Sequence, residues 1–187
     1  MHLADLRGQV RQLGPPRRLL LAANLLADTE SVDQDSAPRL AAEFHHFGVS
    51  VTDLDRSLDF YCHVLGAVVL FPPHSVDEFN FRRVIVWLKG SMCIDLNEHA
   101  ANLGEPFDPS RTGLDHLAFG VCSYDALASW AGHLDVRGVA HSQIRAIAGV
   151  GETFDFRDPD GIQLELWHHD PNGVWASTVQ KLEQPGA

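Results

Sequence analysis

The sequence predicts an α+β protein built from two βαβββ modules in tandem, and three observations lead to this prediction. Strand and helix patterns occur twice in the same order between residues 44 and 168. His46 and His116 are 70 positions apart, and so are Asp95 and Glu165 (116 − 46 and 165 − 95). The strands alternate apolar residues with small or polar ones, the pattern of a sheet that packs one face on helices. A constant offset in two separate strands indicates an internal duplication.

The first module is expected over residues 44–98. It opens with a strand at 44–51, and a helix follows in which Thr52 occupies a favoured N-cap position and Gly66 is the stop signal. The remaining expected elements are the helix itself at 52–66, strands at 67–72, 81–88 and 91–97, and a turn at 89–91.

The second module is expected over residues 114–168 and repeats this order. Ser123 is a plausible N-cap for its helix, and Gly138 lies near the helix end. The sequence DPDG, with Pro second and Gly fourth, has the composition of a tight turn before the last strand. The expected elements are strands at 114–121, 139–147, 152–157 and 162–168 and a helix at 124–138.

The two ends of the chain differ from this patterned region. Residues 1–43 read as a helical extension followed by a polar linker, and residues 169–187 as a C-terminal tail. The apolar run at 19–28 is interrupted by Asn24, is short for the core of a signal peptide, and lacks a clear cleavage site after it. No tract approaches the roughly 18 continuous apolar residues of a membrane span. We therefore expect no membrane partner.

Charge and cysteine content narrow the partners and the compartment. The formal net charge of -11 repels phosphate backbones, so we expect no nucleic-acid partner. Three cysteines without a CxxC spacing favour neither a disulfide framework nor a thiolate zinc site. A reducing, cytoplasmic location fits this pattern best.

The polar face of the strands is the informative one. A solvent-facing sheet usually carries Lys, Glu, Thr and Arg, and this alternative stays open. Here the face carries His, Gly, Ser, Ala and Cys together with Asp95 and Glu165. These residues leave space and offer metal-ligating atoms, which favours a ligand-lined cavity. Two imidazoles with one or two carboxylates suit a divalent Fe, Mn, Ni, Co or Zn ion.

Three stretches resemble the vicinal oxygen chelate superfamily, which includes glyoxalase I, extradiol dioxygenases and bleomycin-binding proteins. They are HHFGVSVTDLDRSLDFYCHVLG, GLDHLAFGV and FRDPDGIQLELW, and the resemblance spans about residues 44–168. It implies a half-open barrel of paired modules around a divalent metal. By this resemblance the ligands are His46, His116 and Glu165, with Asp95 in the remaining place.

Three functions are consistent with the resemblance. The first is glyoxalase-like lyase or isomerase chemistry on a small oxygenated molecule, in which a metal stabilises an enolate and a carboxylate, Glu165 or Asp95, moves the proton. The second is an Fe(II) extradiol-type dioxygenase. His141 resembles its acid–base histidine, but Asp155 stands where that family has a tyrosine.

The third possibility is a protein that sequesters an antibiotic or a similar small molecule without catalysis. Family members of this kind are dimers with an aromatic-lined groove and no metal. The aromatic residues available for such walls are Phe81, Trp87, Trp130 and Trp167. In all three cases we expect a small-molecule ligand and a homodimer.

Overall fold

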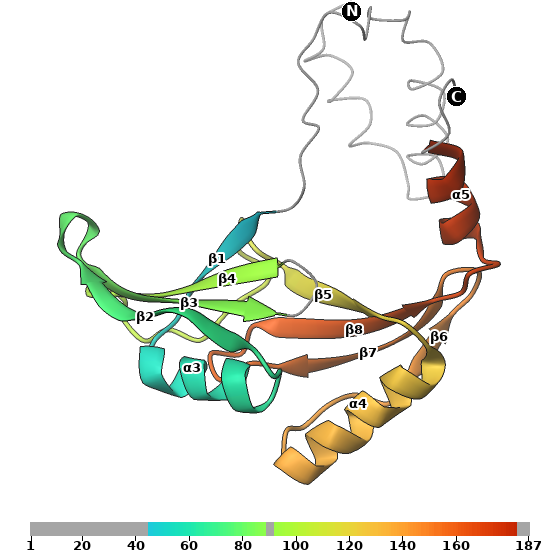
Figure 1. Cartoon of the computed structure of the whole chain (residues 1–187), viewed down its shortest axis with the longest axis horizontal. Coiled ribbons are helices and arrows are strands. Elements are labelled where there is room, and N and C mark those ends of the chain that lie inside the picture. Colours follow the sequence, from blue (N-terminus) through green and yellow to red (C-terminus); the bar gives the residue numbers. More distant parts are fainter. Residues whose placement is uncertain (1–44, 89–91, 183–187) are drawn as a thin grey trace, which may run out of the picture. The chain divides into compact units, whose positions relative to one another are not determined.

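The computed structural model describes residues 45–88 and 92–182, all of which belong to the compact unit Glu43–Ala187. Two four-stranded sheets have the orders β1-β4-β3-β2 and β5-β8-β7-β6, so the second sheet repeats the first. One helix packs on each sheet, and both helices lie on the same side of the two sheets (Figure 1). The α+β class with two βαβββ modules and no closed barrel is confirmed. The predictions for residues 1–43 and for the turn at 89–91 concern segments outside the described residues.

The first module contains the elements expected of it. Its helix and last strands agree with the sequence analysis to within a few residues. The bounds are β1 (His46–Ser50), α3 (Leu54–His63), β2 (Val68–Val76), the 3-10 helix η1 (Asp77–Phe79), β3 (Phe81–Leu88) and β4 (Met92–His99).

Two predictions about α3 are wrong. The N-cap is Asp53, whose carboxylate accepts a hydrogen bond from the Arg56 N–H at 2.9 Å. Thr52 instead donates to Asp160 in the second module, which explains why it does not cap the helix. The helix ends at His63, and Gly66, at φ +72°, turns the chain after the helix has ended.

The strand β2 is longer than expected and lies at the edge of its sheet. Pro72 and Pro73 lie within it, and its register with β3 shifts on either side of Phe71. Because proline cannot donate to a ladder, an edge strand with register irregularities is where a Pro-Pro pair is tolerated.

In the second half of the chain, the strand β6 is shorter than predicted, and the sequence analysis did not assign the helix α5. Its elements are β5 (His116–Val121), α4 (Tyr124–Arg137), β6 (Arg145–Ile147), β7 (Gly151–Arg157), β8 (Gln163–His169) and α5 (Val174–Leu182). Ser123 caps α4 as predicted, and Gly138 ends it in the left-handed conformation. The helix α5 lies within residues 169–187, for which the sequence predicts a C-terminal tail.

The segment predicted as a strand at 139–147 is a strand only at β6. Upstream of it, His141 makes a single bridge to Phe156. Ser142 donates its N–H to the Asp155 carbonyl at 2.8 Å, and its hydroxyl bonds the Asp155 carboxylate at 3.1 Å. A single backbone hydrogen bond and a side-chain hydrogen bond therefore take the place of a regular ladder here.

The strand register confirms the internal duplication. In the parallel pair β1·β4, Gly48 faces Asp95 and His46 faces Cys93. In the parallel pair β5·β8, Ala118 faces Glu165, and His116 faces Gln163. Each histidine thus lies on the strand next to its carboxylate, two positions away in register, and this holds in both modules.

The apolar faces of the strands form the core, as the alternation predicted. Leu164 is fully buried and Leu166 is 4% exposed, while Glu165 between them points to the opposite face. Burying an aliphatic side chain of this size contributes about 1.5–3 kcal/mol. The fully buried members of the core on the sheets are Val84, Val86, Ile94, Leu96, Phe154 and Leu164.

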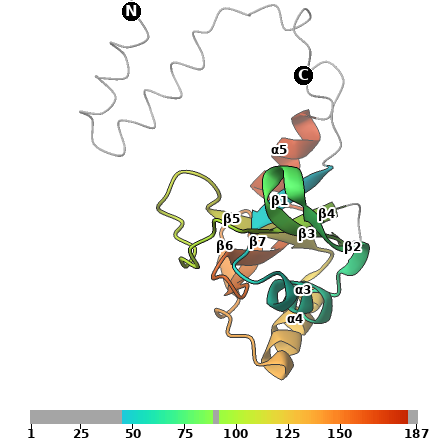
Figure 2. The ribbon, with the colours of Figure 1, turned by 90° about the vertical axis from the view of Figure 1, so that its left-hand side faces the viewer.

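The DPDG turn joins the two modules. Asp160, 7% exposed at its side chain, accepts hydrogen bonds from Thr52 and Ser57, and pairs with Arg56 at 2.7 Å. The carboxylate thereby meets the first turn of α3, where the helix dipole favours a negative charge. In Figure 2, turned by 90° from Figure 1, α3 and α4 again lie on the same side of the sheets. The turn that leads into the last strand of the second module is therefore also a contact with the first.

Asp158 of the same turn is buried against Tyr61, whose hydroxyl donates to it at 3.2 Å. Burial raises the pKa of Asp158 to about 6, although two backbone N–H groups and the Tyr61 hydroxyl oppose this shift. Burial and the neighbouring Asp158 carboxylate also raise the pKa of Tyr61. At pH 7 the Asp158 carboxylate is therefore mostly ionised, and its burial lowers the free energy of unfolding.

Candidate metal and ligand site

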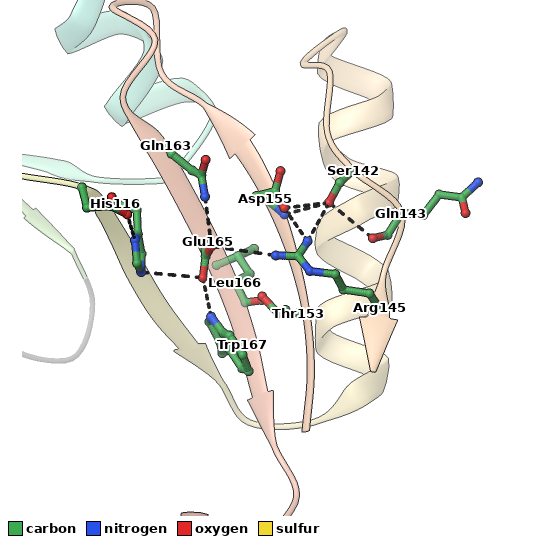
Figure 3. A network of polar contacts seen from close by, with 11 residues as sticks. His116, Ser142, Gln143, Arg145, Thr153, Asp155, Gln163, Glu165, Leu166 and Trp167 are labelled. Atoms are coloured by element: carbon green, nitrogen blue, oxygen red, sulfur yellow. Dashed lines mark hydrogen bonds and ion pairs between the residues drawn. The ribbon is translucent and has the colours of Figure 1, made fainter. Parts of the chain in front are cut away.

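His116 and Glu165 meet on the polar face of the second sheet (Figure 3). The distance from His116 Nε2 to Glu165 Oε2 is 4.0 Å. The Glu165 side chain is 9% exposed, whereas the His116 side chain is 42% exposed. The neighbouring strands β5 and β8 present these two side chains on one face because both residues have the same parity in the parallel register.

The Glu165 carboxylate is held by groups on both sides of it. Gln163 Nε2 donates to Oε1 at 3.1 Å, and Trp167 Nε1 donates to Oε2 at 2.7 Å. Arg145 Nη2 on β6 lies 3.9 Å from Oε1 (Figure 3). These contacts fix the orientation of the Glu165 carboxylate, as the partners of a metal-ligating group commonly do.

His116 has a carboxylate partner on its other ring nitrogen. Its Nδ1 lies 2.6 Å from Asp115 Oδ1. Because a carboxylate only accepts, Nδ1 is the donor in this bond, and Nε2 is the ring nitrogen that faces Glu165. Metal-ligating histidines commonly have such a partner, which fixes the ring orientation.

The pair lies in a cavity of about 280 Å³ that combines polar and aromatic groups. This volume lies just below the roughly 300–1,000 Å³ typical of ligand pockets. Polar atoms come from His116 and Glu165, and aromatic rings from β8 and α5. The residues that line it are His116, Ala118, Phe119, Gly120, Val150, Glu165, Trp167, His169 and Trp175.

The equivalent pair in the first module has different partners. Asp95 is 8% exposed, and its Oδ2 lies 3.4 Å from Arg83 Nη1. His46 is exposed, with its Nδ1 2.6 Å from Nδ1 of His45. His45 occupies the position that Asp115 has in the second module, since both immediately precede the candidate histidine.

The four candidate ligands do not gather at one point within a single chain. Within residues 45–88 and 92–182, no group of three or more His, Cys, Asp and Glu side chains is arranged to hold a metal ion. The structure therefore brings together His116 and Glu165, while His46 and Asp95 belong to the other sheet.

His141, the candidate acid–base histidine, lies away from the cavity lining. Its Nδ1 is 2.8 Å from the Ser142 carbonyl, and its Nε2 is 3.2 Å from the Asp135 carboxylate. Its ring lies 5.2 Å from that of Phe154. Asp155, at the position where the dioxygenase pattern has tyrosine, pairs with Arg145.

The four aromatic residues proposed as walls have different locations. Trp167 lines the cavity, and Trp130 lines a separate groove of about 710 Å³ between α3 and α4. Phe81 stacks with Phe79, and Trp87 is 38% exposed on β3.

Several residues around Glu165 were not singled out by the sequence analysis. The parity of β8 indicates two of them, because Gln163 and His169 share the face of Glu165. Arg145 and Trp175 carry no such signal, since they come from β6 and α5.

A family model described as the Glyoxalase/Bleomycin resistance protein/Dioxygenase superfamily matches residues 43–166. The chain belongs to this superfamily. Two relatives carry no functional description: the uncharacterized proteins YaeR of Escherichia coli (strain K12) and YwkD of Bacillus subtilis (strain 168). YaeR is 31% identical over 67% of this chain and 95% of its own length. YwkD is 30% identical over 68% of this chain and 98% of its own.

Solved structures give the same fold. A glyoxalase/bleomycin resistance protein/dioxygenase domain from Frankia sp. EAN1pec matches with a TM-score of 0.63 and 29% identity, over 69% of this chain and 98% of its own. Two others show the fold alone. They are a trypanothione-dependent glyoxalase I from Leishmania major (TM-score 0.54, 23% identity, 76% and 94% coverage) and the antibiotic-binding protein TnmS3 from Streptomyces sp. CB03234 (0.54, 22%, 71% and 100%).

In the part of the chain that the structure describes, no helix has the length and apolar character needed to cross a membrane.

Proposed function

We propose that this protein is a metal-dependent enzyme that acts on a small oxygenated molecule by glyoxalase-like lyase or isomerase chemistry. The observation that carries the proposal is the pair His116 and Glu165 in the 280 Å³ cavity, with Nε2 and Oε2 4.0 Å apart. Two donors bound to one ion at about 2.1 Å each are about 3.0–4.2 Å apart, so the pair fits a divalent ion. The partners Asp115 and Trp167 orient both donors.

The chain's own residues then have distinct roles. A divalent ion at this pair would supply Lewis-acid stabilisation of the oxygen that becomes negatively charged. Glu165 is the proposed proton carrier at the carbon next to the substrate carbonyl, and Asp95 its counterpart in the first module. Arg145 and Trp167 hold the Glu165 carboxylate in place at the cavity. The neighbouring rings exclude water from one side of the site.

We further propose that His46 and Asp95 complete the site from a second copy of the chain. The candidate histidines are exposed in the single chain, and so are the residues that follow them on the same faces of β1 and β5, Gly48 and Ala118. Because four ligands are expected and one chain brings two together, two facing copies supply the full set. The working unit is then a homodimer with two shared sites.

A complementation experiment tests both the ligands and the sharing. His46→Ala and Glu165→Gln should each lose zinc binding, measured by competition with a chromogenic chelator. Mixing the two variants should restore one intact site in each mixed dimer, because the undamaged halves come from different copies. Single variants that still bind zinc at wild-type strength would show that the ligand assignment is wrong. Loss in both variants without recovery on mixing would argue against a shared site.

A second candidate function is non-catalytic binding of a small molecule, and the stacked rings of Trp167, His169 and Trp175 favour it. Metal content separates the two candidates. Protein purified without added metal should contain, or take up, about one divalent ion per chain if it is an enzyme of the proposed kind. Absence of metal and of uptake would leave the binding function. The dioxygenase hypothesis gains no support from His141, which is engaged with Ser142 and Asp135.

A further inference from the structure

The cavity has a wall that comes from outside the region matched by the family model. Trp167 and His169 extend from the polar face of β8, and Trp175 belongs to α5, whereas the family match ends at residue 166. The ring centroids of Trp167 and His169 are 5.9 Å apart with planes 17° from parallel, and those of His169 and Trp175 are 5.5 Å apart with planes 10° from parallel. The three rings form one near-parallel stack beside the His116–Glu165 pair.

Backbone hydrogen bonds fix α5 beside the cavity without help from the Trp175 ring. The Val174 N–H donates to the Gly149 carbonyl at 2.7 Å, and the Asp170 N–H donates to the Val150 carbonyl at 2.9 Å. The approach is so close that a Cβ on Gly173 would lie 2.6 Å from the Gly149 carbonyl oxygen. Because these contacts already hold α5 in place, the ring of Trp175 is free to serve another purpose.

Trp175 remains 54% exposed even though it is stacked on His169. A large aromatic surface left open at the rim of the cavity indicates a binding surface. At one end of the stack, Trp167 contacts the candidate metal-binding residue Glu165, because its Nε1 donates to Glu165 Oε2 at 2.7 Å. The stack therefore runs from the chemically active group to the open rim.

We propose that α5 is a binding element of this cavity and that Trp167, His169 and Trp175 form a stacking wall for a planar, π-conjugated ring of the ligand. This inference rests on the proposed function in that it concerns the same cavity. A flat ring gains offset stacking against such a wall, whereas a saturated ring of the same size offers no π face. The 280 Å³ volume suits one or two fused rings.

The first test uses naphthalene-2,3-diol as the ligand and the metal-free full chain. The chain has four tryptophans, so the indole N–H signals in a ¹H–¹⁵N spectrum give a small, assignable set. Titration should move the signals of Trp167 and Trp175 and leave those of Trp87 and Trp130 in place. The control compound, decahydronaphthalene-2,3-diol, has the same adjacent oxygens on a saturated two-ring skeleton of matching size and should move none. Shifts confined to Trp130 or Trp87, or equal shifts with both compounds, overturn the inference.

The second test uses variants of α5. Trp175→Ala should weaken binding of naphthalene-2,3-diol about tenfold, and Trp175→Phe should restore most of the affinity. Leu182→Ala, which changes an exposed side chain of the same helix, should have no effect. Thermal midpoints of all three variants report whether the fold is retained. Unchanged affinity in a folded Trp175→Ala protein overturns the inference.

Zinc binding distinguishes this inference from the proposed function. Trp175→Ala should leave zinc affinity unchanged, because Trp175 is separated from Glu165 by the two other rings of the stack. If the wild-type chain binds none of Fe, Mn, Ni, Co and Zn, the proposed enzyme function fails, and the metal-free titration still decides whether the aromatic wall binds a planar ring.

Discussion

The hydroxyl of Tyr61 in α3 donates a 3.2 Å hydrogen bond to Oδ2 of Asp158, 97 residues later, in the turn before β8. Tyr61 is fully buried and Asp158 is 5% exposed. The contact places a carboxylate at the junction of the two modules. Together with the Asp160 contacts it makes the DPDG turn a structural link between halves that the sequence repeats.

This burial predicts a specific pH dependence of stability. The pKa of Asp158 is about 6 in the folded chain and about 3.9 in an unfolded one. Between these values the folded state holds a proton that the unfolded state releases, so stability falls as pH rises from about 4 to 6. At pH 7 the ionised carboxylate lowers the free energy of unfolding by up to about 3 kcal/mol.

Asp158→Asn should remove this dependence while its side-chain oxygen still accepts from the N–H groups of Asp160 and Ile162. Urea unfolding at pH 4, 5, 6 and 7 should show the variant gaining about 1–3 kcal/mol relative to wild type across that range. Asp77→Asn, at an exposed position, serves as the matched control. A difference that stays flat with pH would contradict the assigned pKa shift.

Asp160→Ala should destabilise the chain through loss of the contact between modules. The variant leaves the Thr52 N–H and the Arg56 guanidinium without their acceptor at a partly buried position. We expect a loss of about 2–4 kcal/mol in the free energy of unfolding, measured in urea. Arg56→Met should cost less, because the Arg56 side chain is 49% exposed. Equal losses in the two variants would show that the buried N–H contacts contribute nothing beyond the ion pair.

Trp167→Phe should weaken metal binding without removing the aromatic ring. The change deletes the 2.7 Å hydrogen bond that orients Glu165. Loss of such a partner to a ligand typically lowers metal affinity by about 10–100-fold. Zinc competition measures the effect, and Trp130→Phe, in the groove between α3 and α4, is the control. Wild-type zinc affinity in the Trp167→Phe protein would contradict the proposal that Trp167 orients Glu165 as a metal ligand.

Arg83→Met should strengthen metal binding if Asp95 is a ligand. Arg83 Nη1 lies 3.4 Å from Asp95 Oδ2 and competes with a metal ion for that carboxylate. We expect zinc to bind about three- to tenfold more tightly in this variant, a change of about 0.7–1.4 kcal/mol. In the Asp95→Asn background the same substitution should have no effect. An equal gain in both backgrounds would mean that Arg83 acts by general electrostatics.

The alternation and the 70-residue repeat were sufficient to predict the two modules, the face of the strands on which the histidines and carboxylates lie, and the burial of Leu164 and Leu166. These features are local or periodic, since the side-chain period of a strand decides which face each residue occupies. The same parity places Glu165 beside His116 in the folded chain. The N-cap of α3 was missed because Thr52 is drawn to Asp160, a partner 108 residues away.

The sequence by itself determined the fold class, the duplicated histidine and carboxylate positions and the face on which they lie. Only the tertiary structure decided which of them meet, namely His116 with Glu165, while Asp95 is paired with Arg83. It also supplied Arg145, α5 and the stack that ends in Trp175. These contacts join segments that share no sequence period, so neither the repeat nor the alternation predicts them. Only the packing of the folded chain brings these residues to the site.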